Sequence, residues 1–94
     1  MFSQNEIKKA LVCLAIEKSL MEFGKPTYPK VIEILNKKYH CYLPDCFEHP
    51  EYLTEILKYL YGNASRQIIM SINRELEEFS YEAPVERFIE VISR

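Results

Sequence analysis

A chain of 94 residues is long enough for one domain and too short for two, and its 48% of apolar residues excludes a disordered chain. The formal net charge of −2 gives no overall attraction to nucleic acid or to an anionic membrane. Only two glycines occur, Gly24 and Gly62, which disfavours an all-β fold with its many tight turns.

Cysteine usage and hydropathy indicate a cytoplasmic setting. The number of cysteines is odd, at three, and no secretory signal is visible, so we expect reduced thiols. The longest apolar run, over residues 10–16, is far too short to span a bilayer. The sequence therefore predicts a cytoplasmic protein that does not associate with membranes.

The first predicted helix covers 4–23 and has signals at both ends. Ser3 and Glu6 have the spacing of a capping box, in which each side chain satisfies an orphan amide. Gly24 is expected to end the helix in a left-handed conformation, and Pro26 prevents its continuation. The helix is apolar nearly all round in its middle, which is typical of a helix central to the core. We expect its main stripe to consist of Ile7, Leu11, Leu14 and Met21.

The second predicted helix covers 28–39 and is amphipathic, with Thr27 as its expected N-cap and Pro29 in its first turn. Four lysines oppose one glutamate between residues 25 and 40, which gives this segment a charge of +3. Acidic residues dominate the stretch that follows. The chain is therefore bipolar, with a basic second helix and acidic patches after it.

Three further helices are predicted by turn residues and by apolar spacing. Pro50 and Pro84 suit the first turns of two of them, Gly62 is a stop signal, and Asn63 or Ser65 can cap the helix between. No strand pattern is present. We therefore predict an all-α compact bundle of about five helices in a single domain, with helices near 4–23, 28–39, 50–61, 64–79 and 84–93 and a connector over 40–49.

The connector allows two interpretations. Zinc is bound by thiolates and imidazoles, and this segment supplies two of each, but the spacing is poor and Pro44 stiffens the loop. The alternative is a structural clasp with Leu43 and the cysteines pointing inward, both histidines near the surface, and Asp45 capping a short helical turn over 46–48. We favour the clasp and expect no cofactor and no bound metal. The four residues in question are His40, Cys41, Cys46 and His49.

Catalysis is not indicated by any motif. Cys46 with His49 or Asp45 can be drawn as a nucleophile with its base, but no strained elbow, glycine-rich loop or oxyanion nest accompanies them. Nucleic-acid binding through the basic helix is an alternative. That helix offers only lysines and Asn36, however, whereas a helix that reads a groove carries several Arg, Asn or Gln side chains.

Residues 20–72 also carry a distinctive order of apolar and turn positions. The positions are Glu22-Phe23-Gly24, Lys38-Tyr39, Leu43, Asp45, Pro50-Glu51, Leu57, Tyr61-Gly62, Ala64 and Ile68-Ile69. This order resembles the Nitrosopumilus-type output domains, small helical modules of archaeal proteins that are assigned to the output of signal transduction. The resemblance implies a signalling module without a catalytic motif, and no functional residue is carried over from it.

The resemblance also bears on the connector. In that family a glycine and an aliphatic residue follow the Lys-Tyr pair, and a second aliphatic residue follows the Asp. Here these places hold His40, Cys41 and Cys46. The two cysteines would then occupy core positions, which favours the clasp, whereas histidine in place of glycine is a departure at a position suited to a left-handed backbone.

Together these observations predict a non-enzymatic signalling or interaction domain that binds a protein partner or a second copy of itself. Nucleic-acid binding through the basic helix is the first alternative, and a zinc-stabilised domain is the second. The expected contact surfaces are the basic face of the second helix and the acidic face after it. The candidate partner-binding residues are Lys30, Lys37, Lys38, Tyr39, Glu51 and Glu55.

Overall fold

A computed structural model describes residues 3–94, and the described residues form helices and turns without any strand. The predicted all-α fold is confirmed. Its α-helices are α1 (Gln4–Phe23), α2 (Thr27–Ile34), α3 (Pro50–Tyr61), α4 (Ser65–Leu76) and α5 (Ala83–Ile92). The shorter elements are the π-helical turn η1 (Leu35–Tyr39) and the 3₁₀ turns η2 (Leu43–Phe47), η3 (Gly62–Ala64) and η4 (Glu77–Phe79).

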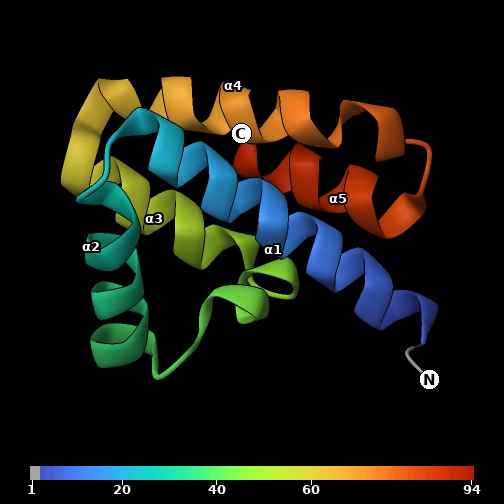
Figure 1. Cartoon of the computed structure of the whole chain (residues 1–94), viewed down its shortest axis with the longest axis horizontal. Helices are drawn as coiled ribbons and strands as arrows, with labels where there is room; N and C mark the ends of the chain where they lie inside the picture. The colour runs from blue at the N-terminus through green and yellow to red at the C-terminus, as the bar shows by residue number, and fades with distance from the viewer. Residues whose placement is uncertain (1–2) are drawn as a thin grey trace.

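Helix α1 is central to the arrangement. It crosses the side of the molecule nearest to the viewer in Figure 1 and contacts α2, α4, α5 and η2. Behind it, α3 packs against α2, α4 and α5, so that all five helices share one apolar core. The largest fully buried side chains of this core are Val12, Ile16, Leu20, Leu35, Leu53, Ile56, Leu57, Ile68, Ile72, Leu76, Phe88 and Ile92.

The buried face of α1 differs from the predicted one. Val12, Ile16 and Leu20 are fully buried, whereas Leu14 is 63% exposed and the predicted stripe as a whole lies toward solvent. Because apolar residues surround this helix, its periodicity does not select one face, and packing against α4 and α5 makes the choice. The prediction of the stripe was therefore wrong, although the central place of α1 was correct.

The helix ends follow the turn residues in part. Ser3 Oγ accepts a hydrogen bond from the Glu6 amide at 3.2 Å, and the left-handed Gly62, with φ of 55°, ends α3. Gly24 does not adopt the expected left-handed conformation, since its φ of 172° is extended. There the chain instead turns directly into α2, through a hydrogen bond from the Thr27 amide to the Gly24 carbonyl at 3.0 Å.

Two predicted caps are absent from the helix starts. Thr27 and Ser65 are the first residues of α2 and α4, and neither helix has a side-chain cap bond at its start. Both residues are buried, so their side chains pack at the edge of the core. Helix α4 is also shorter than 64–79, because 3₁₀ turns flank it on both sides. Tighter turns of this kind are common at helix ends.

The predicted helix over 28–39 changes type at its middle. Helix α2 ends at Ile34, and η1 continues it with wider π-helical turns. His40 then adopts a left-handed conformation, with φ of 55° and ψ of 38°, and the Cys41 amide bonds back to the Leu35 carbonyl at 3.1 Å. This long return bond and the left-handed residue form a Schellman-type ending, a place where glycine is usual.

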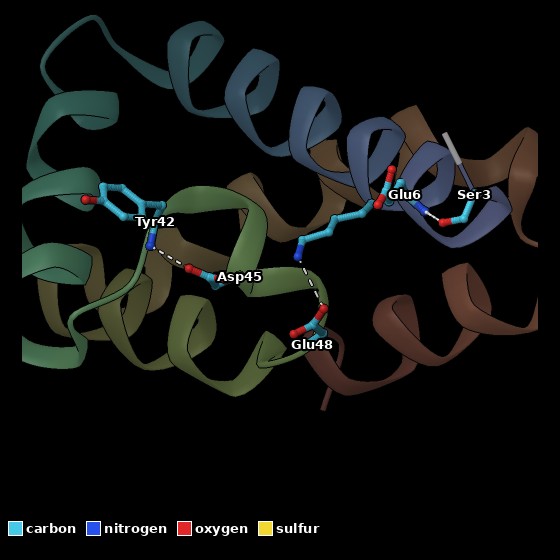
Figure 2. A network of polar contacts seen from close by, with 6 residues as sticks. Ser3, Glu6, Tyr42, Asp45 and Glu48 are labelled. Carbon is cyan, nitrogen blue, oxygen red and sulfur yellow. Dashed lines mark hydrogen bonds and ion pairs between the residues drawn. The ribbon is translucent and has the colours of Figure 1, made fainter. Parts of the chain in front are cut away.

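The connector contains more helix than expected. Its 3₁₀ turn begins at Leu43, three residues before the predicted one, and Asp45 does not cap it from in front. Asp45 lies inside the turn, and its Oδ2 accepts from the Tyr42 amide at 2.8 Å, as Figure 2 shows. This contact closes the turn locally and leaves Leu43 and Cys46 directed into the core.

Candidate functional site

The four candidate zinc ligands are not brought together. Within residues 3–94 no group of three or more His, Cys, Asp or Glu side chains has the arrangement of a metal site. His40 is exposed, and His49 stacks on the Tyr52 ring with centroids 4.7 Å apart. The zinc alternative therefore lacks its ligand geometry.

The cysteines of the connector behave as packing groups. Cys46 is completely buried, and burial, followed by the nearby thiol of Cys13, raises the pKa of its thiol to about 12. Cys41 is half-buried, and its Sγ donates to the Tyr39 carbonyl at 3.2 Å. A nucleophilic cysteine needs a depressed pKa and access to solvent, and Cys46 has neither.

A stack of three rings lies where η1 faces α3. The Tyr39 and Tyr52 rings are 4.2 Å apart with an interplanar angle of 15°, and the His49 ring continues the stack on Tyr52. The Lys38 ammonium is 5.3 Å from the centroid of the Tyr39 ring, within the range of a cation–π interaction. Aromatic groups of a helix, a π-helical turn and the connector are thereby held in fixed orientation.

The Tyr39 hydroxyl is tied to α3 as well. It donates a hydrogen bond to the Glu55 carboxylate, and this bond, followed by burial, raises the pKa of Tyr39 to about 12. The phenol is consequently protonated at neutral pH and acts as a donor. Lys37 is engaged at the same surface, since its Nζ lies 3.0 Å from the Glu33 carboxylate.

These residues border a shallow hollow of about 380 Å³ on the outer side of η1 and α3. We call it the η1–α3 surface, defined by Glu33, Lys37, Lys38, Tyr39, Glu55 and Tyr59. Four of the six predicted partner-binding residues therefore lie together. Lys30 is exposed on α2 and Glu51 is exposed at the start of α3, and neither borders the hollow.

Sequence reasoning missed two aromatic members of this region. Tyr59 is 82% exposed, and Tyr52 forms the middle of the ring stack. A signal was present, because Tyr52, Glu55 and Tyr59 follow one another at intervals of three and four and so share one face of α3. Their relation to Tyr39 depends on the packing of η1 against α3, which no local pattern reveals.

Comparisons of the chain with protein-family models, with curated proteins and with solved structures give no match. None of the helices described between residues 3 and 94 combines the length and apolar character that crossing a membrane requires.

Proposed function

We propose that this chain is a non-enzymatic protein-interaction domain of the signalling-output type and that it binds a protein partner through the η1–α3 surface. The observation that carries the proposal is the ordered group of Lys38, Tyr39 and Tyr52 beside the exposed Tyr59. The signalling role comes from the resemblance of residues 20–72 to the archaeal output domains. The geometry of the η1–α3 surface supports its choice as the proposed contact surface.

Tyrosine and aromatic groups suit protein contacts for a physical reason. They offer a large contact area with few rotatable bonds, so little side-chain entropy is lost when a partner immobilises them. Tyr39 is already fixed by its stack and by Glu55, which lowers the cost of ordering further. Tyr59 is 82% exposed beside this fixed group and is positioned to enter a pocket on the partner.

The charges of the surface favour protein over nucleic acid. Lys37 is paired with Glu33, and the Glu55 carboxylate lies in the same hollow as Lys38. A phosphate backbone would meet these carboxylates together with the lysines, whereas a protein partner can match both signs. Nucleic-acid binding through the lysines is therefore an outcome for experiment to exclude.

Site-specific photo-crosslinking tests the proposal. A photoreactive phenylalanine derivative placed at Tyr59 is expected to capture one dominant protein in the cells that express the chain. The matched control is the same derivative at Met70, which is 61% exposed and lies outside the surface. Equal capture from both positions would refute the η1–α3 surface, and capture of a second copy of this chain would identify the partner as itself.

A salt titration with duplex DNA tests the alternative. The proposal expects weak binding that Lys37→Glu with Lys38→Glu leaves nearly unchanged. Affinity that falls steeply with salt, with the slope of several phosphate contacts, and that the double variant abolishes would overturn the protein-only interpretation.

A further inference from the structure

The outward face of α1 carries a row of large apolar side chains. Ile7, Leu14 and Met21 are 51%, 63% and 55% exposed, and they are seven residues apart. Seven residues correspond to nearly two helical turns, so the three side chains lie in line along the helix. We call them the α1 ridge. The row extends over roughly 21 Å, from 14 residues at 1.5 Å each.

A groove runs beside the ridge. It has a volume of about 670 Å³, and its walls are formed by α1, including Leu11 and Cys13, and by Pro44 of η2. The wall residues between Ile7 and Leu14 are mostly apolar. A ridge next to a groove with helical spacing is the surface on which an amphipathic helix packs, since its own apolar row interdigitates with the ridge.

The lysines and the glutamates of α1 differ in whether they form ion pairs, and this difference indicates the charge of the partner. All three lysines of α1 form ion pairs with other elements: Lys8 with Glu82 at 2.9 Å, Lys9 with Glu48 at 3.2 Å and Lys18 with Glu75 at 3.3 Å. Figure 2 shows the pair at Glu48, which lies directly after η2. The positive charge of this helix is thus neutralised within the fold.

The glutamates of α1, unlike its lysines, have no ion-pair partner in the described part of the chain. The three are Glu6, Glu17 and Glu22. Glu6 and Glu17 both border the groove, and Lys9, which also borders it, is paired with Glu48. Eleven residues are close to three full turns, so these two carboxylates stand on the same side of the ridge, roughly 16 Å apart along the helix. The apolar groove therefore has an acidic edge.

We propose that the α1 groove binds an amphipathic helix of a protein partner that carries an apolar stripe flanked by lysine or arginine. The apolar stripe would cover the α1 ridge, and the basic residues would meet Glu6 and Glu17. This site is separate from the η1–α3 surface, so each can fail without the other.

A second copy of the chain fits the same face less well. In a parallel symmetric pair of α1 helices each glutamate meets its own counterpart. In an antiparallel pair centred on Leu14, Glu6 of one copy faces Glu22 of the other. Like charges across an interface oppose association. A ridge roughly 21 Å long and one helix wide also falls well short of the about 800 Å² per partner that stable interfaces bury.

The test uses two designed peptides of about 15 residues with the same leucine stripe at helical spacing, one flanked by lysines and the other by glutamates. Titration of the whole chain, followed through its backbone amide NMR shifts, is expected to show binding of the basic peptide at α1 and Pro44. The basic peptide should bind about tenfold tighter than the acidic one at low salt.

Variants identify the residues responsible. Leu14→Gln should lower the affinity for the basic peptide about tenfold. Met70→Gln changes a methionine that is 61% exposed on α4 and should leave this affinity unchanged. Glu6→Gln with Glu17→Gln should remove the preference for the basic peptide and keep the binding of its leucine stripe. Thermal melting checks that each variant folds.

Four results would overturn the proposal. Three of them are equal binding of both peptides by the wild-type chain, amide shifts that map away from α1, and an equal loss of affinity in Met70→Gln and Leu14→Gln. A fourth is sedimentation that shows concentration-dependent association abolished by Leu14→Gln, because it would make the occupant of the groove a second copy.

Discussion

At the scale of single residues, Cys46 links burial to pH. Its thiol is completely buried, and its pKa is raised from 9.0 to about 12, first by burial and then by the neighbouring Cys13. A raised pKa means that the folded state holds the proton more tightly than the unfolded chain does. The stabilisation from the neutral thiol is therefore present below pH 9 and is lost as pH rises toward 12.

The free energy of unfolding should consequently fall by on the order of 1 kcal/mol between pH 7 and pH 10 through this one group. Denaturant titrations at both pH values measure the difference. Cys46→Ala should be less stable at pH 7 because it leaves a cavity, but its loss between the two pH values should be smaller by that amount. An identical pH dependence in wild type and variant would show that the thiol is not the cause.

At the scale of elements, α1 has two apolar faces with different energies. Leu20 is fully buried against the core, and Leu14 is 63% exposed on the ridge. Leu20→Ala should lower the free energy of unfolding by about 3 kcal/mol, while Leu14→Ala should change it by less than about 1 kcal/mol. Chemical denaturation of the two variants checks this. Similar losses in both would mean that the ridge is buried.

The ending of η1 offers a second prediction at this scale. His40 occupies a left-handed conformation, which costs an L-residue with a Cβ about 1 kcal/mol, and its side chain is exposed. His40→Gly should therefore keep or raise stability by up to about 1 kcal/mol. Asn36→Gly is the control, since Asn36 lies exposed within the same turn and glycine there should destabilise by about 1 kcal/mol. Equal losses in thermal melts would contradict the strain at His40.

Elements marked by turn residues could be predicted from the sequence, and elements shaped by packing could not. Pro50 and Gly62 bound α3 as their chemistry requires, because one lacks an amide and the other accepts positive φ. The change from α2 to η1 has no such marker. For α1, residues such as Leu14 and Ile16 are equally apolar, so only the position of the neighbouring helices decides which is buried.

The candidate site was predictable to a similar extent. Lys37, Lys38 and Tyr39 are neighbours in sequence, and charge patterning was sufficient to select the two lysines. Glu55 joins them through the Tyr39 hydroxyl, and Tyr59 through the packing of α3. The α1 groove was missed because the apolar residues that form it also suit a core. Its acidic edge could not be predicted, because the ion pairs that neutralise the lysines of α1 join residues far apart in the sequence.

At the scale of the whole molecule, three ion pairs join α1 to the region after η2, to α4 and to the residue before α5. Their side chains remain partly exposed, so each contributes little, about 0–1 kcal/mol. Raising the salt concentration to about 1 M, where the screening length is about 3 Å, should therefore lower the free energy of unfolding by at most about 3 kcal/mol. Denaturation at both salt concentrations measures it. A larger loss would contradict the small contribution expected of partly exposed ion pairs.

The exposure of Met21 makes the α1 ridge sensitive to oxidation. Its thioether is open to peroxide, and the sulfoxide that forms is polar and reversible by reduction. Oxidation should leave the melting temperature nearly unchanged, because Met21 lies outside the core. It should lower the affinity of the basic peptide for the groove. Met21→Leu should keep the affinity after peroxide treatment, and mass spectrometry reports the oxidised fraction. A surface that binds through a methionine can in this way be turned off by an oxidant and restored by a reductase without unfolding the domain.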